Sequence, residues 1–476
     1  MKVIKNYLYN LGYQITALLV PFVMTPYVSR VFGPDGVGNY AVSYSIAQYF
    51  TLIGLLGINT YGTRQIAYCR DDKKTLKSAF WNLNYMRWIT MGLTGVAYFL
   101  YVNFFVSNED KLLYLAQGGI LLAAFVDISW YYAGMEKFKD TAIRGMVVKS
   151  VGVLLVFLFV KNKEQVWLYA LIISVTLFLG QLVMWKNIFK ELNFVKPQRN
   201  IIKKYVFQSF KLWIPAIAIN VYSSMDKVML GVLINNSEAG IYENSQKIIR
   251  MVSAVTTTLA TVMTPKMSNY YKNNNIKKIQ EYVYKTFRFV TILSIPMTFG
   301  IIAVRNTFVP WFFGDGFEKI TSLFVVSAWL VITLSWSNVL GNQVLIACGK
   351  EKYYTYSVIG GAVCNILFNL ILIPHLYSMG AIIASVLAEY IGMFMMVYFS
   401  REIVNGKRLF KGLYQYFVAA FIMMMISFYI GECIGYNMIS TCVQIVIGMA
   451  IFVIVLLGMH NEVVITIINL SKQKRK

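Results

Sequence analysis

The stretches GNYAVSYSI (residues 38–46) and GIYENSQKI (residues 240–248) share the pattern Gly-x-Tyr-x-x-Ser-x-x-Ile at an offset of 202 positions. A second pair, GMEKF at 134–138 and GKEKY at 349–353, repeats a glycine, a glutamate, a lysine and an aromatic residue at an offset of 215. Both pairs lie six predicted apolar helices apart, and an even shift preserves the direction of a helix across a membrane. The two patterns therefore predict parallel structural repeats, with the default substrate site at their interface.

Apolar runs long enough to span a bilayer recur along the whole chain. Of 476 residues, 58% are hydrophobic and 14% are charged, whereas a soluble domain has about 45–50% and about 25%. We predict an all-α polytopic membrane protein of about fourteen transmembrane helices of about 20 residues each. They lie near residues 8–32, 37–58, 82–106, 112–133, 143–160, 166–185, 207–234, 239–264, 284–304, 320–347, 354–374, 380–399, 413–433 and 440–459.

The repeats predict a division of the chain into lobes. Residues 1–200 form an N-terminal six-helix lobe and residues 201–400 a C-terminal six-helix lobe, joined by a lysine-rich loop from Lys186 to Lys204. Residues 401–476 add two further helices and a basic tail.

The distribution of cations predicts the orientation of these helices. With a cytoplasmic N-terminus, and with cations near span ends counted with the adjacent loop, 35 of the 44 Lys and Arg residues fall on the inner side and three deep within spans. The six on the outer side are Arg30, Lys111, Lys161, Lys163, Arg305 and Lys319. Short cytoplasmic loops are enriched in Lys and Arg. We therefore expect a multi-pass membrane protein with both termini in the cytoplasm. The net charge is +23, but the basic residues are distributed between apolar runs instead of forming one patch. This distribution argues against nucleic-acid binding.

Ionisable side chains inside spans indicate where function lies, since each costs about 2.5–3.5 kcal/mol or more at the bilayer centre. In the span 239–264, Glu243, Lys247 and Arg250 recur at helical spacing on one face, as expected for the wall of an aqueous cavity. The alternative is a Glu243–Lys247 pair that neutralises itself within the helix. Four more fall in other spans: Asp127, Asp226, Lys227 and Glu389.

Arg30 lies near the outer end of the first span, roughly where Lys227 lies in the second half. It is either a cavity residue or a side chain that reaches for the membrane interface. Asp226 and Lys227 are adjacent and cannot share a face, so one of them is expected in the cavity. Asp127 and Glu389 are candidates for a proton or cation relay, with a purely structural role as the alternative.

Catalytic patterns are not evident in the sequence. Two histidines, His375 and His460, lie near span ends, so metal triads and histidine-based acid–base chemistry are not expected. No metal or cofactor is predicted. A membrane enzyme acting on lipid-linked sugars is the rival from another class, but the longest predicted outer segment has only about sixteen residues to hold an acceptor. A transporter is therefore favoured over an enzyme.

Several runs together resemble a known family. They are the run from Arg30 to Tyr40, the run from Asp127 to Lys139, the segment from Asp226 to Tyr242, Asn365 to Asn369, Ile373-Pro374 and Gly380 to Glu389. The chain resembles the Wzx-type polysaccharide-biosynthesis flippases of the multidrug/oligosaccharidyl-lipid/polysaccharide exporter superfamily along its whole length.

The resemblance implies a V-shaped, MATE-like bundle that moves an undecaprenyl-diphosphate-linked oligosaccharide from the inner to the outer leaflet. Its products would be capsule, exopolysaccharide or O-antigen, and a polysaccharide polymerase and chain-length machinery would be its partners. The role of holding the diphosphate and sugar would fall on Arg30, Lys227, Lys247 and Arg250. An ion gradient would drive alternating access through Asp127, Asp226, Glu243 or Glu389. A multidrug or lipid II exporter of the same superfamily is the alternative.

Overall fold

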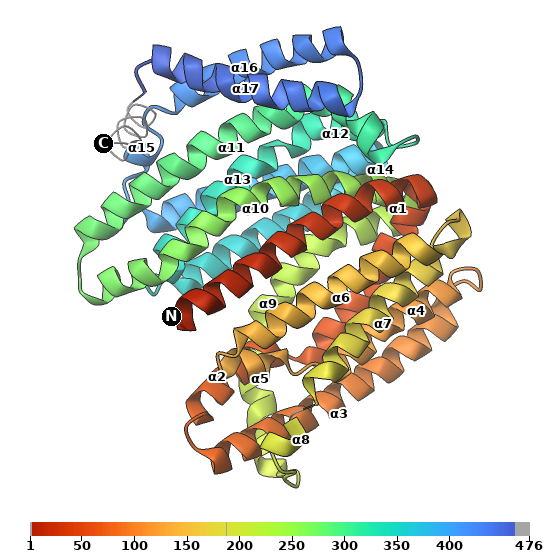
Figure 1. The fold of residues 1–476 in the computed structure, drawn as a ribbon. Helices are drawn as coiled ribbons and strands as arrows, with labels where there is room; N and C mark the ends of the chain where they lie inside the picture. Colours follow the sequence, from red (N-terminus) through yellow and green to blue (C-terminus); the bar gives the residue numbers. More distant parts are fainter. Residues whose placement is uncertain (1, 187, 462–476) are drawn as a thin grey trace. The chain divides into compact units, whose positions relative to one another are not determined.

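The structure, a computed structural model, describes residues 2–186 and 188–461 (Figure 1). Their side chains are described except at 2–11, 13–15, 190, 214–223 and 258–262. Regular structure in the described chain is entirely helical. Packing divides the chain into two compact units, Met1–Gly240 and Ile241–Lys476.

The first unit is built around α1, which packs against α3, α4, α6 and α9, while α4 packs on α7 and α2 on α5. Its elements are α1 (Lys2–Leu55), α2 (Ile58–Cys69), α3 (Lys73–Phe105), α4 (Lys111–Phe125), α5 (Ser129–Gly134), α6 (Phe138–Phe159), η1 (Lys163–Gln165), α7 (Val166–Met184), α8 (Ile188–Glu191), α9 (Arg199–Leu233) and the first turn of α10 (Asn236–Lys272).

The second unit contains the remainder of α10 and the elements that follow it. These are α11 (Ile276–Phe313), α12 (Lys319–Ser327), α13 (Trp329–Asn338), the π-helix η2 (Val339–Ile346), α14 (Glu351–Ser400), α15 (Gly406–Leu409), α16 (Leu413–Ile434) and α17 (Met438–Gly458). The last two helices pack on α11 and on each other, as Figure 1 shows. They therefore belong to this unit by contact. The division at 200 and 400 rests on the sequence repeats and stays a prediction.

Two long helices contain backbone breaks where the sequence predicts boundaries between spans. In α1 the break is Gly33, with φ 66° and ψ −178°, a conformation essentially restricted to glycine. In α14 it is Tyr377, with φ 54° and ψ −132°. Each helix therefore comprises two predicted passes.

Ten segments of the described chain are long and apolar enough to cross a bilayer, and two of them contain these breaks. α9 and α10 have 35 and 37 residues, which also exceeds the bilayer core at about 1.5 Å per residue. Large apolar side chains face outward, such as Phe104 and Phe105 of α3 at 77% and 79% exposure. Lipid is the solvent that suits such a surface, and the predicted all-α polytopic membrane fold is confirmed.

The first pair of sequence motifs meets in space within the first unit. A methyl group on Gly38 would lie 1.6 Å from the carbonyl oxygen of Asn236, and one on Gly240 would lie 2.0 Å from that of Pro34. Pro34 and Asn236 are separated by the same 202 positions as the two glycines. The contact is thus reciprocal, as expected where two equivalent helices cross about a two-fold axis.

Candidate functional site

The helix α10 has two chemically different faces. One face is tied to its own unit by hydroxyl hydrogen bonds: Tyr242 Oη lies 3.2 Å from Ser385 Oγ of α14, and Thr256 Oγ1 lies 2.6 Å from Ser335 Oγ of α13. Nine positions separate Thr256 from Lys247, which at about 100° per residue places them on opposite sides of the helix. Glu243, Lys247 and Arg250 form the charged face of α10, in which Lys247 lies opposite Thr256, Arg250 is exposed and Glu243 is buried.

Within the charged face, the ion pair that forms is Glu243 with Arg250. Arg250 Nη2 lies 3.9 Å from Glu243 Oε2, a long contact, and Glu243 is buried while Arg250 is exposed. Lys247 is half-buried, and its Nζ donates to Asn244 Oδ1 at 3.5 Å. The Glu243–Arg250 pair spans two turns of α10.

Asp226 and Lys227 lie on α9 in the first unit. Both are buried, at 5% and 6% exposure. Two residues earlier, Ser224 Oγ donates to Tyr49 Oη of α1 at 3.2 Å. Charged groups this deep are uncommon unless they are paired or serve function, so the structure retains both as candidates.

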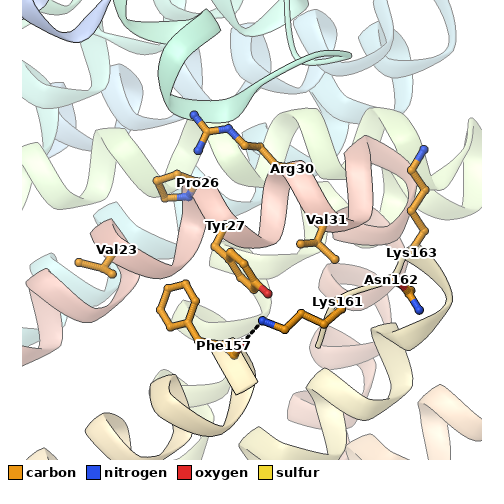
Figure 2. A pocket seen from close by; sticks show the side chains of 9 residues that line it. All are labelled: Val23, Pro26, Tyr27, Arg30, Val31, Phe157, Lys161, Asn162 and Lys163. Atoms are coloured by element: carbon orange, nitrogen blue, oxygen red, sulfur yellow. Dashed lines mark hydrogen bonds between the residues drawn. The ribbon is translucent and has the colours of Figure 1, made fainter. Parts of the chain in front are cut away.

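Arg30 lies in a groove instead of standing alone. The cationic groove, which Figure 2 shows, has a volume of about 680 Å³ and is lined by Val23, Pro26, Tyr27, Arg30 and Val31 of α1, and by Phe157, Lys161, Asn162 and Lys163 at the end of α6 and the loop after it. Lys161 and Lys163 were expected only as outer-loop cations. The groove adds them to Arg30 as candidates for binding an anion.

Asp127 and Glu389 lie on other elements of the fold. Asp127 occupies the break between α4 and α5, and its Oδ1 accepts the Ser129 backbone N–H at 2.8 Å. That contact is a turn of the Asx type, which gives Asp127 a local structural role. Glu389 is half-buried on the second limb of α14. Among the candidates, Glu243 and Arg250 form an ion pair.

One buried cation escaped the sequence analysis because it was counted on the inner side. Arg87 of α3 is fully buried, and its Nη2 donates to Asn84 Oδ1 at 2.5 Å. Its Nε and Nη1 meet no acceptor in the described chain. The sequence feature that could have identified Arg87 is its position inside the predicted span 82–106, three residues after Asn84.

This arrangement predicts that Asn84 matters only as long as Arg87 is present. We expect Asn84→Leu to lower the free energy of unfolding by about 1–3 kcal/mol, because it leaves a buried guanidinium without its acceptor. Arg87→Met should be neutral or stabilising, since an apolar side chain of similar size avoids burying an uncompensated charge. The double variant should be more stable than Asn84→Leu alone. Thermal unfolding of detergent-purified protein measures all three, and Lys73→Met, at an exposed position in the first turn of the same helix, is the control.

The second pair of sequence motifs lies at turns where helices end. Glu136, with φ 57°, accepts from Arg70 Nη1 at 2.7 Å, and this exposed pair raises the pKa of Arg70. In the second unit Lys350 donates to Glu402, which lowers the pKa of that carboxyl. In both units the motif thus fastens a turn to a neighbouring inter-helix segment, although the charges are distributed differently.

The family can now be assigned. A family model described as Polysaccharide biosynthesis protein matches residues 3–271, more than half of the chain. The chain belongs to that family. A second family model, MatE, matches residues 214–371, and the predicted resemblance is confirmed.

Curated relatives of this family member are named as transporters. It is 19% identical over 402 residues to the "Putative O-antigen transporter" of Escherichia coli (strain K12), a match covering 84% of this chain and 96% of that protein. It is 22% identical over 232 residues to the "Probable low-salt glycan biosynthesis flippase Agl15" of Haloferax volcanii, covering 48% and 49% of the two chains.

Solved structures share the fold. The "Lipid II flippase MurJ, inward closed conformation" aligns with a TM-score of 0.78 and 12% identity over 96% of this chain and 100% of that one. The inward-facing conformation of a multidrug resistance MATE family transporter aligns with a TM-score of 0.59 and 15% identity over 83% and 94%. The predicted MATE-like architecture is confirmed, while identities this low carry no information on cargo.

Proposed function

We propose that this protein is a flippase that translocates an undecaprenyl-diphosphate-linked oligosaccharide from the inner to the outer leaflet of a bacterial plasma membrane. The product would be a surface polysaccharide: O-antigen, capsule or exopolysaccharide. A polysaccharide polymerase and chain-length machinery would act on the translocated repeat unit.

The observation that carries this proposal is the charged face of α10. Lys247 lies on the side of α10 opposite Thr256, whose hydroxyl bonds Ser335, and Arg250 is exposed. Cations in a membrane helix are costly unless water or an anion compensates them. A diphosphate is an anion that binds such donors through charge-assisted hydrogen bonds. The proposal assigns the diphosphate and sugar to Lys247, Arg250, Lys227 and Arg30.

Orientation and energy coupling complete the proposal. The excess of Lys and Arg on one side of the predicted spans places both termini in the cytoplasm. An ion gradient would drive alternating access, with a carboxylate that binds the ion in one state and releases it in the other. Asp226, Glu243 and Glu389 suit this role better than Asp127, whose carboxylate already accepts the Ser129 N–H.

The deciding experiment removes the gene from its host and follows the cargo. We expect lipid-linked oligosaccharide to accumulate on the inner leaflet and surface polysaccharide to be lost, and reintroduction of the gene to restore both. Leaflet sidedness can be read from protection of the oligosaccharide against an impermeant glycosidase in oriented membrane vesicles. Normal surface polysaccharide combined with altered drug resistance would instead identify a multidrug exporter.

A further inference from the structure

We propose that the cationic groove between α1 and α6 is a second binding site for the diphosphate of the polyprenyl lipid, on the outer side of the membrane. The groove belongs to the first unit, whereas the charged face of α10 belongs to the second. The identity of the cargo rests on the proposed function, and the location on the outer side of the membrane rests on the predicted orientation of the spans.

The cations of the groove are held by a structured loop. Tyr27 Oη donates to the Val160 carbonyl oxygen at 2.6 Å, which fastens the end of α6 to α1. Beyond it, the backbone N–H groups of Lys161 and Asn162 both donate to Gln165 Oε1, at 2.6 and 3.1 Å, and Asn162 completes a capping box at the start of η1. The loop that carries Lys161 and Lys163 is therefore fixed against the helices on both sides.

The position of Lys161 is fixed further by its own contacts. Its Nζ donates to the Phe157 carbonyl oxygen, the contact dashed in Figure 2, and lies 5.8 Å from the centroid of the Tyr27 ring. One amine keeps two more N–H donors after that bond. Arg30 and Lys163 flank the same groove from α1 and from η1, so three cations surround one volume.

The composition of the groove matches an amphiphile with a multiply charged head. Its nine lining residues include three cations and no acid, and the remainder are mostly apolar, with Val23 exposed at 51%. Seven positions separate Val23 from Arg30, which corresponds to about 10 Å along the helix. A lipid chain can lie along Val23 and Phe157 while its head lies at the cationic end. Three cations match a diphosphate better than the single charge of a phosphodiester lipid.

An acidic cleft beside the groove favours binding of the diphosphate in the groove itself. A second cavity of about 420 Å³ shares Lys163 with the groove but is lined by Asp35, Glu109, Asp110 and Glu164. Like charges repel, so a diphosphate is excluded from the acidic cleft and confined to the cationic groove. Lys163 and Glu164 are adjacent in sequence and lie on this boundary, which provides a matched pair for testing.

The test isolates the groove from the charged face of α10. In a Lys247→Ala/Arg250→Ala background, in phosphatidylcholine nanodiscs, undecaprenyl diphosphate should still bind. Adding Lys161→Gln and Lys163→Gln, which leaves Arg30 in place because the proposed function also uses it, should weaken that binding by about tenfold or more, equivalent to about 1.4 kcal/mol. Glu164→Gln, and Lys111→Gln at another cation predicted on the outer side, should change it by less than about twofold. Lys161→Gln alone keeps the test valid if the combined variant folds poorly.

Each other outcome has a distinct meaning. Unchanged diphosphate binding after removal of the two groove lysines overturns the groove site. Equal affinity for phosphatidylglycerol overturns it as well, because the groove would then be a general anionic-lipid site. If the unmodified protein binds no undecaprenyl diphosphate in either leaflet, the proposed function itself fails. If only the groove proposal is wrong, the unmodified protein still binds undecaprenyl diphosphate, but the Lys247→Ala/Arg250→Ala variant does not.

Discussion

Replacing Lys247 and Arg250 together by alanine is expected to reduce transport by at least about tenfold while leaving the melting midpoint nearly unchanged. A charge-assisted hydrogen bond contributes about 1.5–3 kcal/mol, and each 1.4 kcal/mol corresponds to a factor of ten in binding. Losing two donors to one diphosphate therefore removes most of the affinity. The fold should tolerate the change because the opposite face of α10 carries the bonds to Ser385 and Ser335.

The measurement is flipping of fluorescent lipid-linked oligosaccharide in proteoliposomes, alongside restoration of surface polysaccharide in a deletion strain. Lys272→Ala is the matched control, since it removes an exposed cation from the last turn of the same helix. Lys247→Arg should retain most activity because it keeps the positive charge. Wild-type flipping by the double alanine variant would return the charged face to a structural role.

A second control separates loss of cations from exposure of an acid. Removing Arg250 leaves Glu243 without the partner seen at 3.9 Å, and an uncompensated carboxylate would itself repel a diphosphate. The triple variant with Glu243→Gln removes that repulsion. We expect it to remain impaired; recovery to wild-type flipping would show that the cations act only by neutralising Glu243.

Sequence reasoning predicted the helices well because hydropathy reports on the solvent that each helix meets. The breaks at Gly33 and Tyr377 fall between predicted spans, since polar, glycine and proline residues interrupt the apolar runs there. Helix ends were less predictable: α3 begins at Lys73 and not near 82. A helix that emerges from the membrane continues in water with a polar sequence, so hydropathy does not mark its end.

The candidate site was predictable only in part, because a sequence shows the periodicity of one helix and not the contacts between helices. The charged face of α10 follows from spacing alone. The groove could not be predicted because it brings Arg30 of α1 together with Lys161 and Lys163, which are more than 130 positions away along the chain. Arg87 was missed because burial depends on the packing of α3, and a cation near a span end is equally consistent with an exposed position.

Gly38→Ala is expected to be among the most destabilising single substitutions in the chain, because the added methyl meets backbone and not a flexible side chain. It would lie 1.6 Å from the Asn236 carbonyl oxygen, so α1 and the first turn of α10 must separate. Overpacking typically costs about 1–3 kcal/mol and occasionally more, and we expect a loss of at least about 3 kcal/mol. Gly92→Ala in α3, with nothing within 4 Å, should be neutral or stabilising, since alanine favours helix by about 1 kcal/mol.

The reciprocal geometry makes a stronger prediction for the double variant. Gly38 and Gly240 each face the other helix at one crossing, so the separation forced by the first methyl also makes room for the second. The losses in unfolding free energy should therefore be strongly non-additive, with Gly38→Ala/Gly240→Ala costing clearly less than the sum of the single variants. Thermal unfolding of the four proteins forms the complete cycle. Additive losses would mean that the two glycines act at independent contacts, and that the paired motifs are not joined by a symmetric crossing.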